Sequence, residues 1–244
     1  MLVKIVGDIG NTETKICIVN SNKILKRFNI RTADVNYQLM DKKLKFLKDY
    51  SFKKSIFSSV VPSTFKKIRL YFKKKYNIKI FELKENKFQN FLNIKVNKKQ
   101  VGSDRLANAI SVCKKNKNYI IIDFGTATTF DVVVKKNYLG GIIAPGVNLS
   151  LQTLISNASL ISKVNLSKVR LVIGKNTSSA VKSGFYWGYA GLIDNLIYLI
   201  SKETKKKYSV ILTGGLAHLF KSSIKVRSTI DKDLTIKGLI KLAN

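Results

Sequence analysis

The sequence predicts an α/β protein made of two related halves, and two observations predict this fold class. Three strand-like segments followed by mixed helix and strand occur twice along the 244 residues. A short motif also recurs, because Asp8 opens Asp-Ile-Gly-Asn-Thr and Asp123 opens Asp-Phe-Gly-Thr 115 positions later. At about 150 residues per domain, the length suits one to two domains. We therefore expect two domains, 1–114 and 115–244, which meet at the polar run 114–118 and hold a ligand between them.

The first half is expected to begin with a three-stranded unit. Apolar and β-branched runs at 2–7, 14–19 and 23–30 predict strands joined by short turns. Apolar residues at helical spacing then predict helices near 37–47, 65–76 and 106–113. Pro62 marks a plausible helix start, since proline suits the first turn of a helix.

The second half repeats this order. Three strand-like runs lie between 119 and 143, and a further strand is expected at 208–213. A helix is expected to start at Pro145, directly after a glycine-rich turn. The apolar pattern predicts a long helix at about 177–201.

One face of that long helix carries only small residues. Glycine inside a helix costs about 1 kcal/mol relative to alanine. A stripe of such residues therefore implies a closely packed neighbour, which could be another helix, a second subunit or the ligand. The stripe consists of Ala180, Gly184, Gly188 and Gly191.

The charge is strongly positive, with 45 Lys and Arg against 14 Asp and Glu, a net charge of +31. Nucleic-acid binding is one interpretation. Codon bias is the other, because lysine, asparagine and isoleucine are all abundant and all have A/T-rich codons. The lysines are spread along the chain and no DNA-reading motif accompanies them. We favour codon bias, expect no nucleic-acid partner, and expect attraction of anionic ligands such as nucleotides.

Several classes of function are excluded by composition. A single histidine, His218, does not suit a Ser-His-Asp triad or a multi-histidine zinc site. Cys17 and Cys113 lie far apart in apolar stretches and are expected to be reduced core thiols. No apolar run approaches the roughly 18 residues that cross a bilayer, and the N-terminus lacks the features of a signal peptide. We expect a cytoplasmic protein without membrane contact.

The segment 8–15 is the first candidate site. A strand delivers Asp8 to a tight turn, where Gly10 permits close approach to the backbone. Such a hairpin can present N–H groups to a phosphate, and Asp8 can hold Mg²⁺. The alternative is an ordinary hairpin turn. The recurrence of the motif at Asp123 favours phosphate binding, because a phosphate chain can then be bound from two sides.

The segment 101–105 is the second candidate. Asp104 could act as a base, while the guanidinium of Arg105 grips an anionic substrate group. The alternative is a helix N-terminal aspartate stabilised by the helix dipole, with Arg105 on the surface. The residues alone favour this structural interpretation. The glycine pairs at 140–141 and 214–215 are likewise either turns or places where a nucleotide lies against the backbone.

Taken in order, these motifs resemble the type III pantothenate kinase family, of the superfamily of acetate and sugar kinases, Hsp70 and actin. The resemblance implies two related RNase H-like domains, as in actin-like ATPases, with the active site in the cleft between them. The matching stretches span nearly the whole chain and lie at 8–12, 58–62, 101–105, 123–129, 140–141 with 145–146, 174–177 and 212–215.

The resemblance implies a transferase that moves the γ-phosphate of ATP to the hydroxyl of pantothenate, the first step of coenzyme A biosynthesis. Asp8 would help to place Mg²⁺, and Asp123 would bind a monovalent cation, K⁺ or NH₄⁺. A homodimer is implied as well. The implied ATP contacts are Asp8, Ile9, Gly10, Asn11, Thr12, Glu13, Thr14, Lys15 and Thr126.

The resemblance also implies the substrate site. Asp104 would accept the proton of the pantothenate hydroxyl, and Arg105 would bind the pantothenate carboxylate. Gly102, Ser103 and Thr177 would complete the pocket. The family often has alanine at the position of Ser103 and a tyrosine and an Asn-Pro pair near 95–98, which this chain lacks.

Three functions therefore compete. The first is the pantothenate kinase. The second is a catalytically inactive relative that binds nucleic acid or regulates another protein, motivated by the charge of +31. The third is a kinase or phosphatase of the same superfamily with another small substrate, motivated by the altered segment 95–98. The presence of Asp8, Asp104, Arg105 and Asp123 argues against an inactive relative.

Overall fold

The computed structural model describes residues 2–52, 54–161 and 163–244, so Met1 at the start of the first predicted strand lies outside them. Two compact domains emerge. The first contains the residues up to Cys113 together with Lys136–Tyr138 and Asp233–Asn244. The second contains Lys114–Lys135 and Leu139–Lys232.

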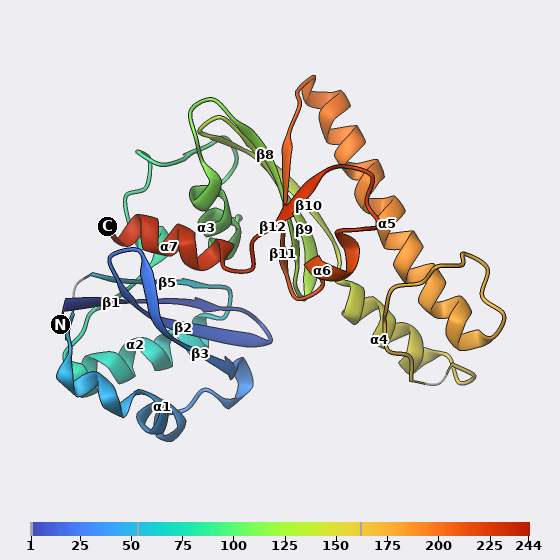
Figure 1. The fold of residues 1–244 in the computed structure, drawn as a ribbon. Helices are drawn as coiled ribbons and strands as arrows, with labels where there is room; N and C mark the ends of the chain where they lie inside the picture. The colour runs from blue at the N-terminus through green and yellow to red at the C-terminus, as the bar shows by residue number, and fades with distance from the viewer. Residues whose placement is uncertain (1, 53, 162) are drawn as a thin grey trace. The chain divides into compact units, whose positions relative to one another are not determined.

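The first domain is built on a mixed sheet (Figure 1) with strand order β3-β2-β1-β5-β6, and β4 also pairs with β1. β1 and β2 are antiparallel, whereas β1 and β5 are parallel. The three strands predicted for this half are confirmed. The strands are β1 (Leu2–Ile9), β2 (Glu13–Asn20), β3 (Lys23–Arg31), β4 (Ser51–Phe52), β5 (Ser55–Ser59), β6 (Ile80–Glu82) and β7 (Asn93–Ile94).

Helices cover both faces of this sheet (Figure 1), with α1 and α2 on one side and α3 and α7 on the other. Ile5, Ile16 and Ile18 pack against Ile68 and Phe72 of α2 in one apolar core. The helices are α1 (Tyr37–Leu44), α2 (Pro62–Tyr76), α3 (Ser103–Val112) and α7 (Leu234–Ala243), with 3₁₀ turns η1 (Thr32–Asp34), η2 (Lys45–Asp49) and η3 (Leu83–Glu85). The predicted helices, including the start at Pro62, are confirmed.

The position of α7 differs from the expectation of one contiguous C-terminal domain over 115–244. The last part of the chain, Asp233–Asn244, belongs to the first domain. Asp233 pairs with Arg27 of β3 at 2.7 Å. Thr235 Oγ1 bonds to Asn108 Oδ1 of α3 at 2.8 Å. Gly238 lies so close to the backbone of α3 that a Cβ atom would overlap the carbonyl of Ala107. These contacts join residues that are far apart in the sequence, so no local sequence pattern predicts them.

The second domain repeats the sheet of the first. Its strand order β12-β11-β8-β9-β10 matches β6-β5-β1-β2-β3 position for position, which confirms two related α/β domains. β8 is antiparallel to β9 and parallel to β11, as β1 is to β2 and β5. Within the first domain, Asn93 and Ile94 of β7 pair in parallel with Asn137 and Tyr138. The strands are β8 (Asn118–Phe124), β9 (Ala127–Val134), β10 (Asn137–Pro145), β11 (Ser209–Gly214) and β12 (Ser228–Ile230).

The helices of the second domain are α4 (Val147–Asn157), α5 (Thr177–Thr204) and α6 (Ala217–Phe220). The predicted long helix is confirmed, and the side chain of Asn176 caps its first turn. The helix expected at Pro145 begins instead at Val147, because Pro145 is the last residue of β10 and Gly146 stays extended. His218 is exposed on the short α6.

Both cysteines are buried, as the sequence predicts. Burial raises the pKa of the Cys17 thiol and of the Cys113 thiol. A raised pKa disfavours the thiolate, so neither residue is poised as a nucleophile. Among the helices of the described ranges, none combines the length and the apolar character that crossing a membrane requires.

Candidate active site

Asp8 lies near the end of β1, next to the corresponding end of the parallel strand β5. It is the register partner of Ser58 in the parallel pair of strands. The buried Ser58 hydroxyl donates a hydrogen bond of 2.6 Å to Asp8 Oδ1. The carboxylate is half-buried and is therefore held in one orientation at the end of the strand.

The hairpin that follows Asp8 is fixed by a residue the sequence analysis did not single out. Thr32 donates its N–H to the carbonyl of Thr12 at 2.9 Å and its hydroxyl to the carbonyl of Gly10 at 2.7 Å. Gly10 donates its own N–H to the carbonyl of Glu13 at 3.0 Å. Thr32 comes directly after the third strand, and its role becomes visible only once β2 and β3 are paired.

The eight residues predicted to contact ATP in this segment are not equivalent. Asn11, Thr12 and Glu13 are exposed at the tip of the hairpin. Ile9 and Thr14 are both fully buried, so their side chains are not at the surface of the domain. Thr14 Oγ1 lies 3.0 Å from Thr32 Oγ1, which gives it a supporting position. Lys15 is half-exposed and lies 3.7 Å from Glu13.

The segment 101–105 forms the start of α3. Asp104 and Arg105 are half-buried in its first turn, and Asp104 Oδ1 accepts the N–H of Arg105 at 2.8 Å. Gly102 leaves room for this carboxylate, because a Cβ atom there would overlap Asp104 Oδ1. Ser103, expected to line the substrate pocket, is only 1% exposed, and its hydroxyl bonds to the main chain of Ser59. Its side chain therefore does not reach the surface.

In the second domain, Asp123 takes the place that Asp8 has in the first. It lies near the end of β8 and is the register partner of Thr213 in β11. Gly214 follows with a φ of +85°, a conformation that favours glycine. A Cβ atom at Gly214 would come within 2.6 Å of Asp123 Oδ1 and of the N–H of Phe124. Of the glycine pair noted in the sequence, Gly214 is therefore needed beside this carboxylate, whereas Gly215 has open space where a Cβ would lie.

Thr126 is exposed in the turn between β8 and β9. The turn is closed by the N–H of Gly125, which donates to the carbonyl of Ala127 at 3.1 Å. The carbonyl of Thr126 faces Gly146 so closely that a Cβ atom on Gly146 would overlap it. Asp123, Thr126 and the glycines at 146 and 214 thus belong to one end of the second sheet.

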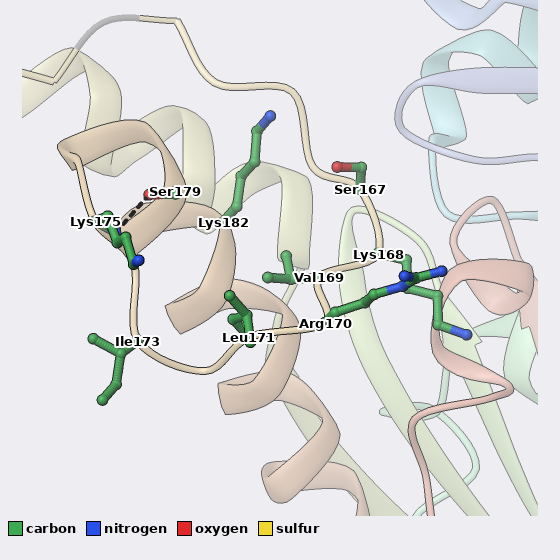
Figure 2. Close-up of a pocket in the computed structure, with 10 residues that line it drawn as sticks. Ser167, Lys168, Val169, Arg170, Leu171, Ile173, Lys175, Ser179 and Lys182 are labelled. Atoms are coloured by element: carbon green, nitrogen blue, oxygen red, sulfur yellow. Dashed lines mark hydrogen bonds between the residues drawn. The ribbon is translucent and has the colours of Figure 1, made fainter.

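Thr177 is the first residue of α5 and is exposed. Beside it, the loop 167–175 and the first turns of α5 enclose a pocket of about 460 Å³ (Figure 2). Its cationic side chains point in different directions, with Val169 and Leu171 between them (Figure 2). The charged side chains that line it are Lys168, Arg170, Lys175 and Lys182.

A metal ion would need ligands from a substrate at this site. Within the described ranges, no three His, Cys, Asp or Glu side chains gather into a metal site. Mg²⁺ is usually held by one or two carboxylates together with substrate phosphates and water. The single carboxylate of Asp8 at a hairpin fits that pattern.

Solved structures first show the fold. The chain is similar to a putative Baf family transcriptional activator from Campylobacter jejuni, with a TM-score of 0.61, 20% identity, and coverage of 98% of this chain and 96% of that one. It is also similar to a ROK family glucokinase from Streptomyces griseus in complex with glucose and AMPPNP, with a TM-score of 0.55, 10% identity, and coverage of 99% and 98%. At these identities the likeness concerns the fold, which is that of the two-domain actin-like ATPases and sugar kinases.

Sequence comparison then gives the family. A model described as type III pantothenate kinase matches residues 4–198. A type III pantothenate kinase from Pelagibacter ubique is 57% identical over 240 residues, which cover 97% of each chain. One from Rhodospirillum rubrum is 39% identical over 245 residues, with coverage of 96% and 95%. The chain therefore belongs to the type III pantothenate kinase family, a family of ATP-dependent kinases, and the resemblance inferred from the motifs is confirmed.

Proposed function

We propose that this chain transfers the γ-phosphate of ATP to the primary hydroxyl of pantothenate, giving 4′-phosphopantothenate in the first step of coenzyme A biosynthesis. The observation that carries the proposal is full-length similarity to named pantothenate kinases, 57% over 97% of the chain. The carboxylates of Asp8, Asp104 and Asp123 are present in this chain, each half-buried near the end of a strand or at the start of a helix. An inactive relative is not favoured by this similarity.

Asp104 is the proposed base. Phosphoryl transfer asks mainly for in-line positioning and charge stabilisation. A carboxylate is a weak base near neutral pH, so Asp104 orients the pantothenate hydroxyl and takes its proton late. The hydrogen bond from the N–H of Arg105 fixes Oδ1 of Asp104 for this role.

Arg105 and Gly102 are the proposed contacts of pantothenate in the first domain. A guanidinium can bind a carboxylate through two parallel hydrogen bonds. Arg105 is half-buried one residue after the proposed base, which suits a substrate with a carboxylate and a hydroxyl. Thr177 is a further proposed contact, at the exposed first turn of α5.

The hairpin at 10–12 and the turn at Thr126 are the proposed ATP phosphate contacts. Both are tight turns with exposed residues at their tips, and main-chain N–H groups at tight turns can bind anions. Of the segment 8–15, we assign side-chain contacts to the exposed Asn11, Thr12 and Glu13 and to the half-exposed Lys15. The buried Ile9 and Thr14 act as supports of the hairpin.

Two cations complete the proposal. Mg²⁺ would be held by Asp8 and the ATP phosphates, and it would offset charge on the transferred group. K⁺ or NH₄⁺ would be held by Asp123, where Gly214 keeps the space beside the carboxylate free of a side chain. Carboxylate and carbonyl oxygens are suitable ligands for both hard cations.

A homodimer is proposed on the exposed face of α5. Apart from the adjacent residues and the backbone of the helix itself, no atom of the described chain lies within 4 Å of an added Cβ at Gly184, Gly188 or Gly191. Leu171 and Ile173, in the loop before α5, are 67% and 83% exposed. A second copy of the chain would cover this face and these side chains. Sedimentation analysis should give twice the mass of 27.5 kDa, and a monomer would refute the proposal.

The test of the activity is ADP production from MgATP by the purified chain, with and without pantothenate, in potassium and in sodium buffer. We expect turnover that requires pantothenate and is faster in potassium. Asp104→Asn should abolish turnover and leave the unfolding curve unchanged. Turnover with another acceptor but not pantothenate would favour a related kinase, and an active Asp104→Asn enzyme would refute the proposed base.

A further inference from the structure

Asp104 and Arg105 both lie in the first turn of α3, so the position of this helix decides where the two side chains lie. α3 packs against α7, the C-terminal helix of the chain (Figure 1). Both helices belong to the first domain. Contacts between them occur at three points along α3, and these contacts determine how α3 is held.

The first contact lies at the C-terminal end of α3. Lys241 Nζ donates to the carbonyl of Ile110 at 3.0 Å and to the carbonyl of Cys113 at 3.3 Å. The last carbonyl groups of a helix have no partner within the helix, and a lysine there also suits the negative end of the helix dipole. Lys241 therefore binds the end of α3 through its main chain.

The second contact lies in the middle of α3, where the two helices approach most closely. A Cβ atom on Gly238 would overlap the carbonyl of Ala107, so α7 leaves no gap beside the main chain of α3. Close packing of this kind prevents a sideways approach of the two helices. It does not by itself stop one helix from sliding along the other, because van der Waals contacts are individually weak and carry little direction.

The third contact is the nearest to the proposed base. Thr235 Oγ1 donates to Asn108 Oδ1 at 2.8 Å, since an amide oxygen can only accept. Asn108 is fully buried and lies four residues after Asp104, so the two residues share one face of α3, one turn apart. A buried polar atom that loses its partner is costly. This hydrogen bond therefore fixes both the rotation of α3 and its position along its axis.

α7 is itself bound to the sheet that carries Asp8. Asp233, the N-cap residue of α7, pairs with Arg27 of β3 at 2.7 Å. β3 pairs with β2, and β2 pairs with β1, where Asp8 lies. α7 therefore contacts the helix of one proposed catalytic carboxylate and the sheet of the other.

We propose that Thr235 is a positioning residue for phosphoryl transfer, because its hydroxyl, acting through Asn108, fixes Asp104 relative to the strands that hold Asp8. The proposal rests on the proposed role of Asp104 as the base. Displacement of a reacting group by about 1 Å can cost about 100-fold in rate, so a hydrogen bond one helical turn away can matter.

The test uses valine, which has the shape of threonine without its hydroxyl. Thr235→Val keeps the packing of α7 and removes the donor to Asn108, whereas Thr235→Ser keeps the donor. We expect Thr235→Val to lower kcat by about 10-fold with little change in the KM for ATP. Thr235→Ser should keep most of the kcat of the unmodified chain. Urea unfolding of each variant reports its stability separately.

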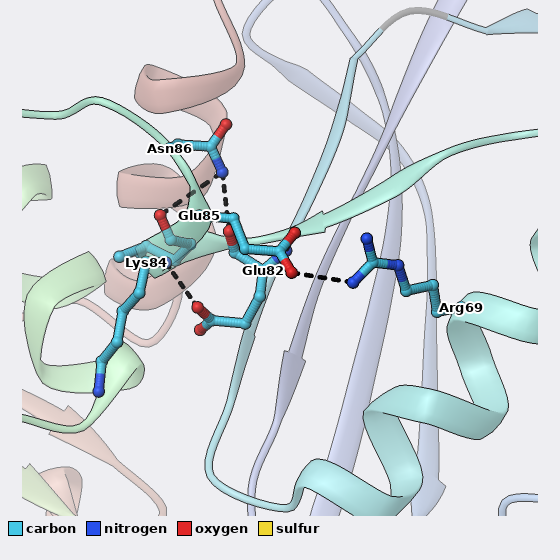
Figure 3. Close-up of polar contacts among 6 residues, drawn as sticks. Arg69, Glu82, Lys84, Glu85 and Asn86 are labelled. Carbon is cyan, nitrogen blue, oxygen red and sulfur yellow. Dashed lines mark hydrogen bonds and ion pairs between the residues drawn. The ribbon is translucent and has the colours of Figure 1, made fainter. Parts of the chain in front are cut away.

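Asn86→Ala is the matched control, because it removes a buried polar contact beside α3 without touching α7. Asn86 follows the turn η3, which also contacts α3, and its Nδ2 donates to the carbonyl of Glu82 at 2.8 Å (Figure 3). The turn keeps its capping box and the ion pair between Arg69 and Glu85 at 2.9 Å in this variant (Figure 3). We therefore expect a loss of stability and an unchanged kcat.

Lys241→Met is a second variant, which serves if Thr235→Val is too unstable to assay. Because it acts at the end of α3 opposite to Asp104, its kcat should fall less than that of Thr235→Val and more than that of Asn86→Ala. Equal kcat values in Thr235→Val and Thr235→Ser would overturn the proposal, as would a loss in Asn86→Ala that matches Thr235→Val or Lys241→Met. Retained turnover in Asp104→Asn would instead refute the base itself, which keeps the two failures distinguishable.

Discussion

The two domains place an aspartate at the same point of the same sheet and surround it differently. Asp8 of β1 pairs in register with Ser58, and Asp123 of β8 pairs in register with Thr213. In the first domain the next residue of the partner strand, Ser59, is bound by a helix side chain. In the second domain the next residue is Gly214, which adopts a φ of +85°. The surroundings of Asp8 are therefore fixed by hydroxyl groups, whereas the space beside Asp123 is left open because Gly214 has no side chain.

If Asp8 and Asp123 have the proposed roles, the duplicated sheet would supply two kinds of cation site. A carboxylate held by a hydroxyl donor keeps one orientation, which would suit a metal bound together with phosphate oxygens. A carboxylate beside a glycine would leave space for a larger ion. The topology is shared, and the two strands that pair with β1 and β8 differ in their last residues, Ser59 and Gly214.

The largest expected effect comes from removing the two carboxylates in turn. Asp8→Asn should lower kcat by about 100-fold or more, because an electrostatic contact to the transferred group is lost. Asp123→Asn should lower kcat less, by about 10-fold, and abolish the advantage of potassium over sodium. Steady-state ADP release at varied MgATP in both buffers measures this. Equal losses in the two variants would contradict the distinction between the sites.

A comparison of one glycine variant in each domain tests how closely the chain packs around the two aspartates. Gly214→Ala should destabilise the second domain by about 3 kcal/mol, because a positive φ is strained for alanine and the new Cβ meets Asp123. Gly10→Ala in the first domain should cost less than about 1 kcal/mol, since its Cβ would meet only the carbonyl of Glu13 at 3.2 Å. Urea unfolding of the two variants measures both costs. A Gly214→Ala protein with unchanged stability would show that this strand end adapts.

The hairpin of the first domain can be loosened without touching its exposed tip. Thr32→Ala removes the hydroxyl that bonds to Gly10 and faces Thr14, and should cost about 1–2 kcal/mol. The KM for ATP should rise several-fold. Thr204→Ala is the control, since its hydroxyl bonds to the carbonyl of Ile200 at 2.7 Å at the end of α5. If both variants raise the KM equally, the hairpin is not the cause.

The smallest expected effect concerns pH. Burial raises the pKa of Glu82 above its unfolded value, so the folded state binds a proton more readily. The contribution of Glu82 to stability is then fully present below the usual glutamate range, near pH 4.3, and is lost as pH rises through the folded pKa. Glu82→Gln should therefore gain stability relative to the unmodified chain as pH rises above about 4. Parallel urea midpoints across that range would contradict the assignment.

Much of the fold was predictable because it depends on local patterns. The predicted strands and helices of both halves rest on periodicity, and Pro62 and Asn176 provide recognisable helix starts. β5 and α7 were not predicted as elements. β5 is a short strand, and its own sequence does not predict that it pairs with β1. α7 belongs to a domain that begins more than 200 residues earlier.

In the candidate site, too, some residues could be predicted from the sequence and others could not. Asp8 and Asp123 stand out because a carboxylate at the end of an apolar run is unusual, whereas the role of Asp104 comes only from the resemblance to the family. Thr32 and Ser103 form hydrogen bonds to residues 22 and 44 positions away, so no spacing rule points to them. Ser103 is predicted as a lining residue, and its burial and its contact with Ser59 could not be read from the sequence.

Because α7 at the end of the chain belongs to the first domain, the order of translation affects folding. Gly238 packs directly on the main chain of α3, the helix that carries Asp104. Synthesis proceeds from the N-terminus, so the whole second domain emerges from the ribosome before α7 does. Until then the first domain exposes the apolar side of α3 and one face of its sheet, and such surfaces are prone to aggregation in nascent chains. The kinase therefore acquires its complete catalytic domain only after the other domain has been made.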